Sequence, residues 1–148
     1  MTETPQQRSR TMRAVRSCDT GPEIVVRRFL HAAGLRFRLH DRQLPGAPDL
    51  VFPSRRIALF VHGCFWHQHP NCEAAARPKS HADYWNRKLD GNIARDVRCR
   101  NELETLGWKV LVIWECETRS PKYLVALAAR IRREKPAMFH ARARKNQA

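Results

Sequence analysis

One short apolar run constrains the fold of this chain more than any other segment. It reads Trp-Lys-Val-Leu-Val-Ile-Trp over residues 108–114, and Gly107 stands directly before it. A nearly continuous apolar run of this length is typical of a strand that is buried on both faces. A chain of 148 residues has enough material for one core but not comfortably for two. We therefore predict a single domain whose sheet has a central strand over 108–114.

Helix and strand patterns on either side of this run predict an α/β sandwich. Apolar residues at helical spacing indicate helices, and short apolar runs between turn residues indicate strands. The predicted order is a helix beginning at Thr20, strands over 35–39, 49–52 and 56–62, a helix over 80–106, the strand over 108–114 and a helix over 121–133. The strands over 49–52 and 56–62 form a hairpin. The predicted fold class is a mixed β-sheet flanked by helices.

Capping residues set the expected starts of two helices. Thr20 and Glu23 form a capping box, in which each side chain accepts a backbone N–H bond at the helix start. Ser80, followed by Asp83, is the expected cap of the helix over 80–106. The apolar stripe expected on one face of that helix comprises Leu89, Ile93 and Val97.

The charge of the chain points to nucleic acid as its partner. Against 14 acidic residues stand 28 lysines and arginines, and the resulting formal net charge of +14 attracts polyanions. Solvated ends are the alternative explanation: residues 1–19 have the composition of a basic arm and 134–148 that of a basic flexible tail, around a domain over 20–133. Arginines also alternate with apolar residues over 35–39, however, which gives that strand a predicted cationic face.

Nothing in the sequence predicts export or insertion into a membrane. No stretch approaches the roughly 20 apolar residues of a membrane span, and the first residues carry no signal-peptide core. We therefore expect a cytoplasmic, nucleoid-associated protein in which thiols stay reduced. Its five cysteines are an odd number, which fits metal ligation better than a disulfide framework.

Four residues with suitable side chains predict a zinc site. Cys64, His69 and Cys72 fall within nine residues of sequence, and Cys116 follows the strand predicted over 108–114. Three thiolates and one imidazole are the closed tetrahedral ligand set of structural zinc. The alternative is that Cys116 is a buried, unliganded thiol and that the loop histidines are solvated.

The same segment carries two adjacent large aromatic residues, Phe65 and Trp66. A zinc site would hold this loop rigid, and rigid aromatics in a basic protein can insert between base pairs at an unstacking cost of roughly a few kcal/mol per step. A mismatched step opens at lower cost. Sequence alternation favours the simpler alternative, in which one of the two aromatics belongs to the core and only the other is exposed.

Carboxylates and histidines near the predicted element ends are candidates for phosphodiester chemistry. Asp49 begins a strand and Glu23 stands near the start of the first helix, and carboxylates can hold the one or two Mg²⁺ ions that activate water. His62 and His67 can each act as a general base or hold the scissile phosphate. Ordinary alternatives exist: Asp49 as a turn residue, Glu23 as half of a capping box, and both histidines as solvated loop residues.

Taken in order, these motifs resemble the very short patch repair endonucleases. The similarity extends from about residue 10 to residue 133. It rests on Met-Arg-Ala-Val over 12–15, Asp19-Thr20 with Glu23, Leu-Pro-Gly over 44–46 before Pro48-Asp49, Val-His-Gly-Cys-Phe-Trp-His over 61–67, Tyr84-Trp85, Gly-Trp-Lys-Val-Leu over 107–111 and Trp-Glu-Cys over 114–116. The loop motif and the Trp-Glu-Cys motif are highly specific to that family.

The resemblance implies a restriction-endonuclease-like fold and a nick 5′ to the thymine of a T:G mismatch, which arises when 5-methylcytosine is deaminated. The implied partner is double-stranded DNA with such a mismatch, mismatch-repair proteins being further candidate partners, and the implied state is a monomer. The implied cofactors are two catalytic Mg²⁺ ions and one structural Zn²⁺ ion.

The resemblance also implies roles for individual residues. Asp49 would bind Mg²⁺ together with the main-chain carbonyl of Val61, and Glu23 would act through metal-bound water. His62 and His67 would lie at the scissile phosphate, one of them helping to activate water. The remaining roles are zinc binding by Cys64, His69, Cys72 and Cys116, insertion into DNA from the major-groove side by Phe65, Trp66 and Trp85, and approach from the minor-groove side by Met12.

Some residues depart from the family pattern. Val61 stands where that pattern has threonine, which a main-chain contact tolerates. Pro70-Asn71 separates His69 from the second cysteine, so that His67 is the alternative zinc ligand. The second hairpin strand also lacks the acid-x-Lys motif that most restriction-endonuclease-like nucleases carry, and the resemblance gives His62 part of the role of that lysine. Two rival functions stay open: a zinc-stabilised DNA-binding module without catalysis, and a restriction-type nuclease that cuts both strands.

Overall fold

The computed structural model describes residues 19–135, so the N-terminal arm up to residue 18 and nearly all of the basic tail lie outside the described residues. The helices are α2 (Gly21–Ala32), α3 (Ala82–Thr105) and α4 (Pro121–Arg133), and the strands are β1 (Arg38–Leu39), β2 (Leu50–Phe52), β3 (Ile57–His62) and β4 (Lys109–Trp114). This order of elements confirms the predicted α/β fold class. Within 19–135, no helix is long and apolar enough to span a membrane.

The strands form one mixed sheet in the order β1-β2-β3-β4. β2 and β3 are the predicted hairpin, with Leu50 opposite Leu59. β3 and β4 run parallel, with His62 beside Trp114 at their carboxyl ends. A parallel pair requires a crossover connection, and α3 lies within it. Because of this topology, the segment after β3 and the segment after β4 leave the sheet at the same edge.

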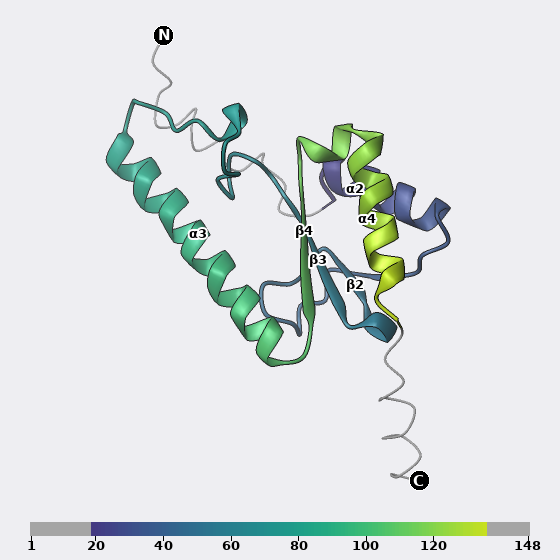
Figure 1. Cartoon of the computed structure of the whole chain (residues 1–148). Coiled ribbons are helices and arrows are strands. Elements are labelled where there is room, and N and C mark those ends of the chain that lie inside the picture. The colour runs from purple at the N-terminus through teal and green to yellow at the C-terminus, as the bar shows by residue number, and fades with distance from the viewer. Residues whose placement is uncertain (1–18, 136–148) are drawn as a thin grey trace.

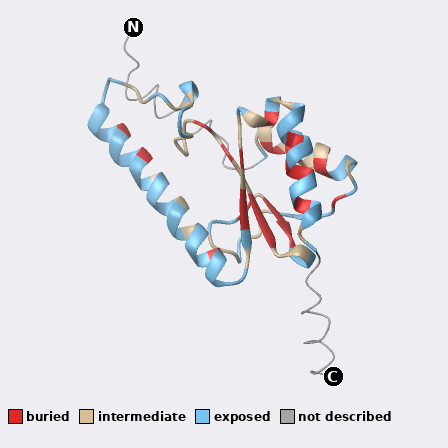
Figure 2. Ribbon diagram, in the orientation of Figure 1, coloured by how far each residue is buried: buried red, intermediate tan, exposed pale blue. Residues whose placement is uncertain are grey.

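The two faces of the sheet are covered unequally. Leu59 and Leu111 belong to the larger core, which is closed by α2 and α4 (Figure 1). On the opposite face a smaller cluster joins Ala58 and Val110 to Leu103, near the end of α3. Figure 2 shows that the strands are buried and that α3 is exposed along most of its length. α3 therefore packs on the sheet only near its C-terminal end.

The strand predicted over 35–39 is wrong in its extent, because only Arg38 and Leu39 are extended and paired. Gly34, with φ of 88°, ends α2, and the N–H of Leu35 still donates to the Leu30 carbonyl of that helix. The guanidinium of Arg36 likewise donates to the carbonyls of His31 and Leu35. The backbone N–H of Leu35 is therefore used by the end of the helix and is not available to a strand.

Two expectations for the helix over 80–106 are also wrong. His81, in the left-handed region with φ of 54°, precedes α3 in place of Ser80, and its side chain makes no capping hydrogen bond. Of the predicted apolar stripe only Leu89 is buried, whereas Ile93 and Val97 are 38% and 54% exposed. Helical spacing identified the stripe correctly, but its C-terminal part lines an open cleft and not a core.

Candidate active site

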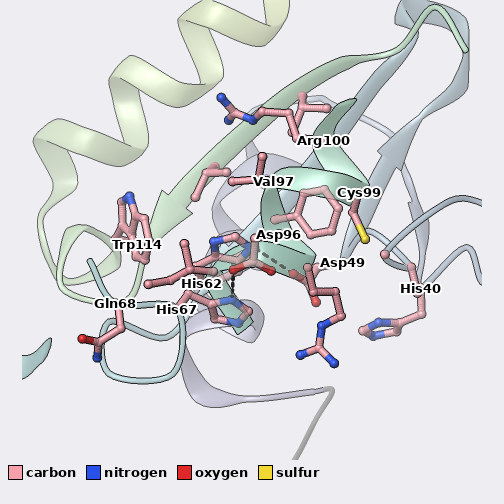
Figure 3. Close-up of a pocket in the computed structure, with 18 of the residues that line it drawn as sticks. His40, Asp49, His62, His67, Gln68, Asp96, Val97, Cys99, Arg100 and Trp114 are labelled. Atoms are coloured by element: carbon pink, nitrogen blue, oxygen red, sulfur yellow. Dashed lines mark hydrogen bonds and ion pairs between the residues drawn. The ribbon is translucent and has the colours of Figure 1, made fainter. Parts of the chain in front are cut away.

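A cleft of about 1150 Å³ lies between α3 and the sheet face that α3 leaves uncovered. Val110, Val112 and Trp114 alternate along β4 and line its floor. α3 is fixed near its start by buried Trp85 and near its end by buried Leu103, and between them it borders the cleft. Figure 3 shows His62, His67, Asp96 and Asp49 meeting inside this cleft. The arginines that line it are Arg42, Arg95 and Arg100.

Asp49 lies directly before β2 and faces the end of β3. Its Oδ2 accepts the backbone N–H of Val61 at 2.7 Å. Because the N–H and C=O of one strand residue point to the same side, the Val61 carbonyl is directed to this side as well. Burial and the neighbouring Glu23 carboxylate raise the pKa of Asp49 to about 8. Two carboxyl groups this close share a proton unless a cation takes its place. Carboxylate and carbonyl oxygens are the ligands that a hard cation such as Mg²⁺ prefers.

Glu23 does more than cap a helix. The capping bond from its N–H to Thr20 Oγ1 is present at 3.4 Å, but its carboxylate accepts the N–H of Asp19, and not of Thr20, at 2.9 Å. The residue is 1% exposed and its carboxylate contacts Arg27 and His40. The structure thus brings Glu23 together with Asp49, which the capping pattern alone does not explain.

His62 and His67 stack face to face, with ring centroids 3.9 Å apart and an interplanar angle of 5°. His62, at the end of β3, is buried, and burial together with the nearby charge of His67 lowers its pKa to about 4. His67 Nδ1 lies 2.7 Å from Asp96 Oδ2 of α3. A carboxylate that accepts from Nδ1 fixes the tautomer in which Nε2 can accept a proton. His67 is therefore an oriented candidate base that stacks on a second imidazole.

Asp96 is the site residue that sequence reasoning missed. It lies in the middle of a polar helix among other charged residues, where no motif distinguishes it. Its partner is 29 positions away in the sequence. What identifies it is its position three residues after Ile93, on a part of α3 that lines the cleft.

The four predicted zinc ligands come together at the edge of the sheet where β3 and β4 end. Their ligand atoms all lie within 4.8 Å of one another. His69 Nδ1 is 3.7 Å from Cys64 Sγ and 3.4 Å from Cys116 Sγ. Zn–S and Zn–N bonds of about 2.3 and 2.0 Å place sulfur and nitrogen roughly 3.5 Å apart around a tetrahedral ion. The donor set therefore fits zinc. His67, the alternative ligand, lies instead in a separate group with His62 and Asp96.

The predicted inserting aromatics form one cluster beside this metal-ligand set. The ring centroid of Trp85 lies 5.5 Å from that of Phe65 and 6.0 Å from that of Trp66. Trp85 is 8% exposed, whereas Phe65 and Trp66 are both half-buried. The alternation argument, which favoured one core and one exposed aromatic in the Phe65-Trp66 pair, is thus wrong, because Trp85 takes the buried position. Met12 lies outside the described residues.

Polar bonds hold the aromatic loop against α3. Arg77 donates from Nε to Gln68 Oε1 at 2.9 Å and from Nη2 to Asp90 on α3 at 2.7 Å. Asn92, also on α3, donates to the Trp66 carbonyl at 2.9 Å. The loop is therefore bonded to α3 on one side and carries three of the four residues of the Cys-His cluster on the other.

The sequence is similar to one family of known proteins. The family model described as DNA mismatch endonuclease Vsr matches residues 2–74. The type II nicking enzyme V.XorIIP of Xanthomonas oryzae pv. oryzae is 52% identical over 128 residues, which is 86% of this chain and 91% of that protein. The DNA mismatch endonuclease Vsr of Escherichia coli is 41% identical over 117 residues, 79% of this chain and 74% of that protein. The type II nicking enzyme V.NmeAIP of Neisseria meningitidis is also 41% identical over 117 residues, 79% of this chain and 83% of that protein.

Proposed function

Since the chain belongs to the Vsr family of DNA endonucleases, we propose that it nicks one strand of duplex DNA 5′ to the thymine of a T:G mismatch and depends on Mg²⁺ to do so. The observation that carries the proposal is that Asp49, whose carboxyl group is paired with the buried Glu23, and the His67–Asp96 pair line one cleft together with arginines. These are the groups that phosphodiester hydrolysis needs: a cation site and a base. The same reaction starts very short patch repair after deamination of 5-methylcytosine.

The cation site is proposed at Asp49. The Asp49 carboxylate and the Val61 carbonyl would hold Mg²⁺, with Glu23 acting through water; the total of two ions stays a prediction. When bound, the metal ion makes water more acidic and stabilises negative charge on the leaving oxygen. Support comes from the raised pKa of Asp49, because a buried carboxyl pair that cannot release its last proton near neutrality is stabilised by a cation.

His67 is proposed as the general base and His62 as a phosphate-contacting neighbour. Asp96 would hold the Nδ1 proton of His67, so that Nε2 takes a proton from the attacking water. The lowered pKa of His62 keeps that ring neutral near pH 7, able to donate one hydrogen bond to the phosphate. This assigns different work to two histidines that the sequence did not distinguish.

Zinc and aromatic residues are proposed to build the DNA-opening loop. Zn²⁺ would be held by Cys64, His69, Cys72 and Cys116. Phe65 and Trp66 would insert into the mismatched step from the major-groove side, with Trp85 as their support, and Met12 would approach from the minor-groove side. Support comes from the hydrogen bond that holds the loop on α3 and from the contacts among the three aromatic rings.

The test is a nicking assay with purified protein and Mg²⁺ on labelled duplexes that carry T:G, other mismatches or only paired bases. We expect one cut, in the thymine strand, on the T:G duplex, and no cut after Asp49→Ala. Activity unchanged by Asp49→Ala would reject the metal assignment. Equal cutting of all duplexes would reject mismatch specificity, and linearised plasmid would favour a restriction-type nuclease that cuts both strands.

A further inference from the structure

A basic side chain lies among the carboxylates next to the proposed magnesium site. Arg27, one turn after Glu23 on α2, directs its Nη2 into a cluster formed by Asp19, Glu23 and His40. This nitrogen is 2.5 Å from Asp19 Oδ1 and 2.8 Å from His40 Nε2, and it also bonds to Glu23 Oε2. Asp19 and His40 line the catalytic cleft as well. The cluster therefore adjoins the Asp49 site through Glu23, which interacts with Asp49.

Burial makes a positive charge necessary at this position. The Glu23 side chain is almost completely enclosed, and a buried carboxylate without a cationic partner is strongly destabilising. Asp49 interacts with Glu23, and Asp19 shares its Arg27 partner, so that two further carboxyl groups lie nearby. An arginine is always charged, unlike histidine or lysine in a buried site. Its charge reaches Asp49 too, whose pKa it lowers against the larger effects of burial and Glu23.

The surroundings of the Arg27 nitrogen resemble those of a metal ion. Ligand atoms of Asp19, Glu23 and His40 lie within 4.8 Å of one another, the arrangement expected around a single cation. Nη2 carries two hydrogens but has three close neighbours, whereas an ordinary arginine–carboxylate pair is bidentate. Arg27 Nε is also the only buried side-chain polar atom in the described part of the chain without a hydrogen-bond partner. The position of this guanidinium is therefore set by the three contacts of Nη2 and not by a bidentate bond to one carboxylate.

We propose that Arg27 is a built-in cation that occupies the Asp19–Glu23–His40 cluster, excludes metal from it and holds Glu23 beside Asp49. The proposal rests on the function proposed above, because it takes Asp49 as the magnesium ligand. All three contacts of the cluster to Glu23 use Oε2. The Glu23 carboxylate is thus held through one oxygen, which restricts its rotation away from Asp49. Arg27 is a positioning residue, and the metal stays on the Asp49 side.

Mn²⁺ binding to the full chain, counted from the electron paramagnetic resonance signal of free Mn²⁺, tests this without DNA or activity. Mn²⁺ accepts carboxylate and imidazole ligands and can enter the cluster once Arg27 is gone. We expect Arg27→Met, which keeps the aliphatic stem, to bind one more equivalent of Mn²⁺ than the wild type. Arg27→Lys, which keeps a charge, should bind the wild-type number. An unchanged number in Arg27→Met, or an extra ion in Arg27→Lys, would overturn the proposal.

Asp19→Asn is the second variant, and it answers the question even if Arg27→Met fails to fold, because the Asp19 side chain is 55% exposed. If Arg27 fills the cluster, this change leaves the number of bound ions as it was; loss of an equivalent would show that metal binds there in the wild type and would overturn the proposal. Asp49→Asn separates the two proposals. If it removes no ion, the magnesium assignment fails, while the comparison of wild type with Arg27→Met keeps its meaning.

Discussion

His67 Nδ1 and Asp96 Oδ2 are 2.7 Å apart, and this bond joins the loop after β3 to the middle of α3. The Asp96 carboxylate thereby orients one imidazole of a stacked pair whose other member, His62, is buried, and this burial lowers the pKa of His62 to about 4. α3 therefore contributes a residue to the candidate active site and is not only a cover for the sheet. The bond makes the orientation of the proposed base depend on a helix residue that has no motif of its own.

Asp96→Asn should slow nicking without weakening DNA binding. Asparagine keeps the shape of the side chain but loses the charge that holds the Nδ1 proton and orients His67. General base catalysis contributes roughly 10²- to 10⁴-fold, so we expect the single-turnover rate on a T:G duplex to fall by about 10²-fold. Fluorescence anisotropy should show an unchanged Kd for the same duplex.

Glu104→Gln is the matched control, because Glu104 is an exposed acid near the end of the same helix. It removes the same charge from α3 and should leave the nicking rate as it was. If both variants lose activity equally, the effect is one of overall charge and the assigned role of Asp96 is wrong. A weaker Kd that accounts for the whole loss in Asp96→Asn would lead to the same conclusion.

Cys116→Ser should release zinc and destabilise the domain. Cys116 is the one member of the Cys-His cluster that comes from the segment after β4, so that the metal would join two distant parts of the chain. Structural zinc contributes directly to folding free energy. We expect about one equivalent of zinc in the wild type, the number that one tetrahedral site holds, and none in the variant, with a lower Tm.

Cys99→Ser provides the comparison for this change. Cys99 is partly buried, whereas Cys116 is exposed, and Cys99 lines the cleft, outside the cluster of ligands. Its replacement should leave the zinc content unchanged. A Cys116→Ser protein that is metal-free and as stable as the wild type would contradict a structural zinc.

Local patterns in the sequence predicted most of the fold. The hairpin of β2 and β3 and the buried β4 follow from short-range hydrophobic patterns, and all three were predicted. The Cys-His cluster was found because most of its members are close in sequence. Asp96 and Arg27 were missed because their roles exist only through contacts across the cleft or within a buried cluster. Val97 shows the same limit, since helical periodicity reveals a face but not whether that face meets a core or a cleft.

Trp66→Ala should reduce discrimination between mismatched and paired DNA more than it reduces general affinity. Trp66 is half-buried, and its main-chain carbonyl is held by Asn92, so the loop keeps its position when the ring is removed. The ring is available to stack on an opened base step, an interaction worth roughly 1–3 kcal/mol. The measurement is the ratio of Kd values for T:G and T:A duplexes. Equal weakening on both duplexes would count against insertion.

Trp85→Ala, by contrast, should act first on stability. Trp85 is 8% exposed and packs against Phe65, Trp66 and Tyr84. Removing a buried tryptophan costs about 3–5 kcal/mol of unfolding free energy. Urea unfolding should show this loss for Trp85→Ala and a clearly smaller one for Trp66→Ala. A similar small loss for both would mean that Trp85 is not the support of the cluster.

Two glycine-to-alanine changes should shift stability in opposite directions. Gly46 has φ of 77°, and a Cβ there would lie 3.0 Å from Cys99 Cβ, where the loop before Asp49 touches α3. A side chain in that backbone region costs about 1–3 kcal/mol, and the contact with α3 adds to it. Gly91, inside α3, has nothing within 4 Å of an added Cβ. Because alanine favours a helix over glycine by about 1 kcal/mol, Gly91→Ala should raise the urea midpoint while Gly46→Ala lowers it. An unchanged urea midpoint in Gly46→Ala would mean that this loop does not pack tightly on α3. The contact would then not hold that end of the cleft in place.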